Sequence, residues 1–140
     1  MRSEILVTDN PGTAAEEVIL RGLVAFNEAK APGADFRPLA VLVKGETGAV
    51  LGGLAGWTAW RWLYVRLFWL PETLRGRGLG REVLVRAERE ALARGCHAAW
   101  LDSFAFQAPG FYQRCGYSVF GVLDDYPPGH RRFFLRKTLG

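Results

Sequence analysis

The six residues RGRGLG at positions 75–80 join an apolar run to a segment with helical spacing. The run before them, WLYVRLFWL at 62–70, predicts a strand that ends at Pro71. A glycine-rich turn between a strand and a helix restricts this part of the chain to an α/β arrangement. The helix is predicted from apolar residues that recur at every fourth position: Leu79, Val83, Ala87 and Ala91.

The N-terminal part predicts a strand at 4–9 followed by a helix at 13–30. Thr13 and Glu16 have the spacing of a capping box, and apolar residues follow one face of this helix as far as Phe26. The later elements expected in chain order are a hairpin at 38–60, a strand at 97–106, a short helix at 108–116, and closing strands at 117–123 and 131–139.

Length and composition favour a single folded domain over residues 1–140. The chain is 49% hydrophobic and 23% charged, which is typical of a globular protein. Its net charge of +4 suits an anionic ligand, and because the basic residues are spread along the chain, nucleic acid is a weaker hypothesis. No apolar run has the length of a membrane span, and no signal peptide is recognised, so we expect no membrane partner and a cytoplasmic protein.

The cysteines and histidines do not predict a metal site. Cys96 and Cys115 are the only cysteines, and they do not form a CxxC pair. The two histidines are far apart in the sequence, without clustered acidic residues. We therefore expect no metal.

The glycine segment itself has two open interpretations. Glycines allow close approach of the backbone to a ligand, and the helix that follows offers free N–H groups and the positive end of its dipole. Together these favour a pyrophosphate site, to which Arg75, Arg77 and Arg81 add charge. The alternative is a glycine turn that only connects two elements, and the segment alone does not separate the two.

Two ordered motifs resemble the GCN5-related N-acetyltransferase (GNAT) family. The first is a strand, an Arg-x-x-Gly-x-Gly pattern and a helix, which falls here on Arg75, Gly78 and Gly80. The second is a short helix with Phe-Tyr before a Gly-aromatic pair, here FYQRCGY at 111–117. The resemblance is clear from about residue 39 onward. It implies an α/β (α+β) fold with a mixed, mostly antiparallel central sheet and helices on both faces.

The resemblance also implies acetyl-CoA as cosubstrate. Backbone N–H groups of the loop would hold the CoA pyrophosphate, and the backbone of the preceding strand would pair with the pantetheine arm. Many members have an asparagine on this arm where Ala105 stands, and Gln107 is a candidate substitute. The residues implied in acetyl-CoA binding are Phe68, Trp69, Leu70, Arg75, Gly76, Arg77, Gly78, Leu79, Gly80, Arg81, Gln107 and Tyr112.

Catalysis is expected to be direct attack of a primary amine in a ternary complex. Tyr112 matches the family tyrosine that protonates the leaving CoA thiolate, whereas a core-packing role is the alternative. Asp102 stands in an otherwise apolar strand, so a general base and a hydrogen-bonded structural aspartate are equally favoured. Candidate residues for binding the acceptor are Asn27, Trp57, Trp60 and Trp62.

Partners and competing functions remain to be tested. The acceptor is expected to be a small-molecule or protein amine, and the family resemblance implies a homodimer. A non-catalytic CoA- or nucleotide-binding regulatory module is the main alternative function, and a basic RNA-binding protein is the third.

Overall fold

The computed structural model describes residues 2–140 and consists of two compact units, Met1–Ala34 and Asp35–Gly140. The first unit contains one helix, α1 (Thr13–Lys30). The strand predicted at 4–9 is wrong, because these residues form no ladder with another strand. The single domain over residues 1–140 remains a prediction.

Helix α1 has the predicted bounds but lacks the predicted cap. Gly12 is the N-cap, with φ of 78°, and no side chain caps the helix, so the capping box at Thr13 and Glu16 is wrong. The helix begins one residue earlier than a Thr13 cap would require, with Thr13 already in its first turn. No residue of α1 is buried, and Val18 is 71% exposed.

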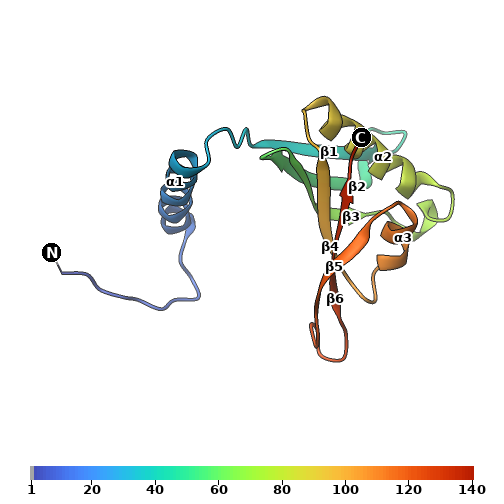
Figure 1. Cartoon of the computed structure of the whole chain (residues 1–140). Helices are drawn as coiled ribbons and strands as arrows, with labels where there is room; N and C mark the ends of the chain where they lie inside the picture. Colours follow the sequence, from blue (N-terminus) through green and yellow to red (C-terminus); the bar gives the residue numbers. More distant parts are fainter. Residues whose placement is uncertain (1) are drawn as a thin grey trace. The chain divides into compact units, whose positions relative to one another are not determined.

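The second unit is built on a six-stranded sheet in the order β1-β2-β3-β4-β6-β5 (Figure 1). Only β3 and β4 are parallel, and the other neighbours are antiparallel. This confirms the mixed, mostly antiparallel sheet. The strands are β1 (Arg37–Lys44), β2 (Val50–Ala59), β3 (Trp62–Trp69), β4 (Ala98–Phe104), β5 (Ser118–Leu123) and β6 (Arg132–Thr138).

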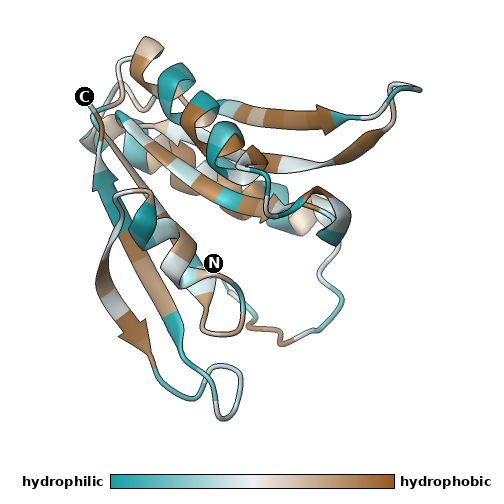
Figure 2. Cartoon of the chain, turned by 90° about the vertical axis from the view of Figure 1, so that its right-hand side faces the viewer, coloured by the Kyte–Doolittle hydropathy of each residue, from teal (hydrophilic) through white to brown (hydrophobic). Residues whose placement is uncertain are grey.

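Two helices lie over the same face of this sheet, α2 (Leu79–Ala93) and α3 (Pro109–Arg114) (Figure 1). Figure 2 shows hydrophobic stretches on several strands. Burial alternates along β4, so Ala99, Leu101 and Ser103 face the core. The predicted apolar face of α2 is confirmed, because Val83, Ala87 and Ala91 are buried. They pack with sheet residues that include Leu39, Leu54, Leu63, Val65, Leu101 and Leu135.

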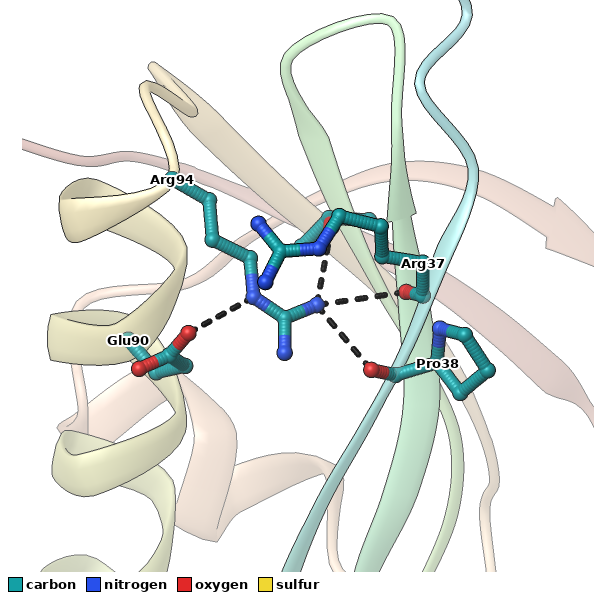
Figure 3. Close-up of polar contacts among 5 residues, drawn as sticks. Arg37, Pro38, Glu90 and Arg94 are labelled. Atoms are coloured by element: carbon teal, nitrogen blue, oxygen red, sulfur yellow. Dashed lines mark hydrogen bonds and ion pairs between the residues drawn. The ribbon is translucent and has the colours of Figure 1, made fainter.

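Arg94 links the C-terminal end of α2 to strands β1 and β2 through hydrogen bonds (Figure 3). Its Nη1 donates to the carbonyl oxygens of Arg37 and Pro38, at 3.2 and 3.0 Å, and to Thr58 Oγ1 at 3.1 Å. Its Nε donates to Glu90 at 2.7 Å. The planar guanidinium therefore serves four acceptors from three elements, which fixes one end of α2 while the other end meets the glycine loop.

Candidate functional site

The parallel pairing of β3 and β4 stops partway along both strands. It runs from Trp62 opposite Ala98 to Val65 opposite Leu101, yet β3 continues to Trp69 and β4 to Phe104. Beyond the last pair each strand keeps its outer neighbour, β2 or β6. The backbone edges that face each other at this gap are therefore available to a ligand.

A β-bulge in β3 accompanies the separation of the strands. Ala55 and Gly56 are adjacent on β2, but their partners on β3 are Leu67 and Val65. Arg66 is thus an extra residue, and such insertions bend the strand and increase its twist. Gly56 is required beside it, since a Cβ there would lie 1.9 Å from the Tyr64 carbonyl oxygen. The bulge explains why β3 turns away from β4 at this point.

The glycine loop has the backbone conformation that only glycine adopts without strain. Gly76 and Gly78 have φ of 76° and 77°, and Gly78 is the left-handed N-cap of α2. The first amide groups of α2 have no partner inside the helix and point out of its N-terminus. Gly80 faces α3, and a Cβ there would be in ordinary van der Waals contact with Phe111, at 3.5 Å.

Two of the predicted arginines shape the loop. Arg75 Nε donates to the Leu70 carbonyl oxygen at 2.9 Å, and Arg77 Nη2 donates to that of Thr73 at 3.0 Å. Each guanidinium has further N–H groups for an anion. A cavity of about 510 Å³ opens beside the loop, lined by Val41, Leu42, Val43, Arg77, Gly78, Leu79, Glu82, Val83 and Arg86.

Tyr112 lies on α3, against the strand that borders the gap. Its ring contacts Phe68 of β3, with ring centroids 6.2 Å apart, and also Phe111 and Tyr117. Burial, with smaller contributions from Cys115 and Asp102, raises the pKa of Tyr112 to about 12. The phenol is therefore neutral at physiological pH, and its proton remains available for donation.

Asp102 forms an ion pair on the face of the sheet opposite α2. Arg132 Nε and Nη2 donate to its Oδ2 atom, at 2.8 and 2.7 Å. The guanidinium also lies over three rings, those of Phe104, Tyr126 and Phe134, at 5.1–5.4 Å from their centroids. An aspartate in an apolar strand needs such a partner, so the contact favours the structural role over the general base. Sequence reasoning overlooked Arg132, which is adjacent to Asp102 only through strand pairing.

Gln107 and Ser103 organise the turn between β4 and α3. The Phe104 amide donates to Gln107 Oε1 at 2.7 Å, so the turn fixes this side chain, and its contact with pantetheine remains a prediction. The Ala108 amide, at the start of α3, lies 3.4 Å from Ser103 Oγ, which is buried. Ser103 therefore helps to set the start of α3, a role that its place next to Asp102 in the sequence did not indicate.

The structure does not gather the predicted acceptor-binding residues at the gap. Trp60 lies in the β2–β3 turn and Trp62 is the first residue of β3, near His97. From Trp62 to Phe68 the strand rises by about 20 Å, so these two tryptophans are far from Tyr112. Trp57 packs between Phe36 and Tyr64, whose ring stacks on Trp100. Asn27 belongs to α1 in the first unit, and its role remains a prediction.

Other kinds of site have little support among residues 2–140. The structure shows no group of three His, Cys, Asp or Glu side chains placed to hold a metal ion within this range. Cys96 and Cys115 are not joined in a disulfide, and burial raises the pKa of both thiols. No helix in the described range has both the length and the apolar character needed to cross a bilayer.

Comparisons with known proteins agree with this geometry. Blasticidin-S acetyltransferase of Streptomyces morookaense is 42% identical over 79% of this chain and 84% of its own. Acetyltransferase Atu2258 of Agrobacterium fabrum is 36% identical over 94% of this chain and 96% of its own. The crystal structure of a candidate acetyltransferase from Agrobacterium tumefaciens superposes with a TM-score of 0.94 at 35% identity, over 98% of this chain and all of that one.

The family model described as the acetyltransferase (GNAT) family matches residues 14–117. This range covers both motifs, the strand gap between them and Tyr112. The members of this family are acetyl-CoA-dependent N-acetyltransferases. The chain therefore belongs to the acetyltransferase (GNAT) family.

Proposed function

We propose that this enzyme transfers the acetyl group of acetyl-CoA to the amine of a small molecule, by direct attack in a ternary complex. The observation that supports this best is the gap between β3 and β4, which ends directly before a glycine loop at the N-terminus of α2. An extended arm with amide groups and an anionic end fits this combination, because strand edges bind amides and helix N-termini bind phosphates.

The residues present fit both parts of acetyl-CoA, the extended pantetheine arm and the anionic pyrophosphate. The free edge of β3 includes Phe68 and Trp69, and it continues into Leu70, whose carbonyl oxygen Arg75 already engages. The loop residues Gly76 and Gly78 hold their backbone without side chains that would cover the amides. Acetyl-CoA supplies the acetyl group as a reactive thioester. The chain's own part is to bind the arm and orient this thioester in the gap.

Tyr112 is proposed as the proton donor to the sulfur of the departing thiolate. Its contact with Phe68 puts the ring beside the strand that borders the gap, and the raised pKa keeps the phenol protonated. Strand N–H groups at the gap are proposed to stabilise the oxyanion. The amine's proton is proposed to leave through water. Arg132 binds Asp102 through Oδ2, and the Oδ1 atom of Asp102 is proposed to accept a hydrogen bond from this water.

A small-molecule acceptor is favoured by the named relatives. One is a blasticidin-S acetyltransferase, and another, from Azospirillum brasilense, is an IAA acetyltransferase, 31% identical over 70% of this chain. The sheet face opposite α2 carries Trp57, Tyr64 and Trp100, whose rings suit a flat or cationic acceptor. A homodimer is also proposed, and sedimentation at two protein concentrations tests it.

The test is release of free CoA thiol from acetyl-CoA across a panel of amines. We suggest blasticidin S, an aminoglycoside, a polyamine, free amino acids and a peptide amine, with calorimetric titration of acetyl-CoA alongside. We expect acetyl-CoA binding and turnover with at least one small amine. Binding without turnover on any amine would favour the regulatory module, and absence of acetyl-CoA binding would reject the proposal.

A further inference from the structure

A buried carboxylate in the middle of α2 connects three elements behind Tyr112. Glu88 is only 7% exposed. The Tyr117 hydroxyl donates to its Oε2 at 2.7 Å, and Lys137 Nζ donates to its Oε1 at 2.9 Å. Tyr117 immediately precedes β5 and Lys137 lies in β6, so α2, the α3–β5 connection and β6 meet at one side chain.

The chemistry of this cluster suits a fixed support. A buried carboxylate needs hydrogen bonds and an opposite charge, and Glu88 has both, one on each oxygen. Burial raises the pKa of Tyr117 strongly, and Glu88 raises it further. The Tyr117 phenol therefore remains a donor to Glu88 and cannot ionise near neutral pH. Lys137 also lies over the Tyr117 ring, 5.6 Å from its centroid.

Tyr117 is joined to Tyr112 through both backbone and ring. The Tyr117 amide donates to the Tyr112 carbonyl oxygen at 3.0 Å, and the two rings meet edge to face with centroids 6.0 Å apart. Between them, Gly116 makes the turn at φ of 96°, and a Cβ there would press on the Lys137 side chain at 3.3 Å. The position of Tyr117 therefore determines where the last turn of α3 places Tyr112.

We propose that Glu88 and Tyr117 are positioning residues for the reaction, and that they act only through Tyr112. The hydrogen bond from Tyr117 to Glu88 holds the Tyr117 ring, and this ring holds the Tyr112 phenol at the gap between β3 and β4. The inference rests on the proposed role of Tyr112 as the proton donor.

The test is a double-mutant cycle of Tyr117→Phe and Tyr112→Phe, measured as kcat with saturating acceptor. Tyr117→Phe keeps the ring and loses only the hydroxyl that Glu88 holds. We expect its kcat to fall by about ten- to a hundredfold, since small misplacements of catalytic groups have effects of this size. The KM for acetyl-CoA should change by less than about twofold. In the Tyr112→Phe background, Tyr117→Phe should cause no further loss.

Two further variants separate positioning from stability. Glu88→Gln still offers an oxygen to the Tyr117 hydroxyl, so its kcat should stay close to that of the wild type even if its melting temperature falls. Glu90→Gln, on the same helix at a half-exposed carboxylate that pairs with Arg94, is the control and should leave kcat unchanged. If Tyr117→Phe does not fold, Glu88→Met removes the same hydrogen bond from the other side, and the cycle is run with it.

The outcomes distinguish this inference from the proposed function. Losses that multiply in the double variant, or a wild-type kcat for Tyr117→Phe, would overturn the positioning role and leave Tyr112 as the donor. Normal turnover of Tyr112→Phe alone would instead reject the proposed donor, and the positioning role with it.

Discussion

Val65 of β3 and Leu101 of β4 are the last residues that face each other across the parallel junction of the sheet. Both side chains are buried in the core under α2. The strands separate immediately beyond them, so the proposed site for the acetyl group lies next to buried core residues. A rigid floor of this kind holds reacting groups in place more precisely than a loop does.

The glycine loop can be tested with a pair of equivalent substitutions. Gly78 and Gly95 both have positive φ, 77° and 88°, and a Cβ at either position would meet open space. Alanine at either should therefore reduce the free energy of unfolding by a similar amount, about 1–2 kcal/mol. Only Gly78→Ala should also weaken acetyl-CoA binding, by about ten- to a hundredfold, because it would disturb the proposed hydrogen bonds from the loop amides to the charged pyrophosphate. Calorimetry and urea unfolding provide the two measurements, and equal affinities would contradict the pyrophosphate assignment.

Tyr112→Phe keeps the ring contacts with Phe68 and removes the proton. We expect kcat to fall by about ten- to ten-thousandfold, because general acid–base groups contribute up to about ten-thousandfold, while acetyl-CoA affinity changes little. Single-turnover kinetics with a good acceptor give the chemical step itself, so that slow product release does not mask the loss. A decrease in affinity alone would instead indicate a binding role.

The raised pKa of Tyr112 also predicts the pH dependence. Its folded pKa of about 12 lies above the unfolded value of 10.0, so the phenol is protonated in both states below about pH 10. The neutral form contributes stability that is complete below pH 10 and is lost as the pH rises toward 12. The pH–rate profile between about pH 6 and 10 should therefore have no alkaline decline caused by Tyr112. A decline in that range that disappears in Tyr112→Phe would refute this.

The ion pair of Asp102 and Arg132 should stabilise the fold more than an exposed pair nearby. Both side chains are largely buried, whereas Asp124, which pairs with Arg131, is 75% exposed. We expect Asp102→Asn to reduce the free energy of unfolding by about 1–3 kcal/mol, and Asp124→Asn by less than about 1 kcal/mol. Urea unfolding measures both. If Asp102→Asn also lost more than about a hundredfold in kcat at unchanged stability, the carboxylate would be the base after all.

Arg94 should be important for stability but not for chemistry. Arg94→Met removes four hydrogen bonds and keeps most of the side-chain volume, and we expect a loss of about 2–4 kcal/mol in the free energy of unfolding. Arg86→Met, on the exposed side of the same helix, should cost less than about 1 kcal/mol. Thermal unfolding compares the two. Equal losses would mean that the contacts of Arg94 add nothing to the helix.

Much of the fold follows from local patterns in the sequence. The hairpin at 38–60 and the helix after the glycine loop depend on hydrophobic periodicity and on turn residues, which act within a few positions of each other. The strand expected at 4–9 is wrong because a short apolar run favours an extended backbone but does not show that a neighbouring strand is there to pair with it.

The details of the site depend on contacts that sequence spacing does not reveal. The bulge at Arg66 follows from the register between two strands, which one strand alone does not indicate. Arg132 meets Asp102, and Tyr117 meets Glu88, only once the chain has closed its sheet and docked α2. The positions of the tryptophans illustrate the same limit, because Trp60 and Trp62 lie at or just before the start of β3, and their role in acceptor binding remains a prediction.

The gap between β3 and β4 also has a consequence for self-association. An unpaired strand edge at the border of a sheet is a template for pairing with another chain, and proteins usually protect it with charges or cover it. Here the unpaired edges lie in the interior of the sheet, with β2 and β6 on their outer sides. A second polypeptide would have to bring its side chains between two strands that still converge at Val65 and Leu101. A narrow, unbranched molecule can enter the gap without this steric conflict. The gap therefore admits a ligand but disfavours aggregation by strand pairing with a second chain.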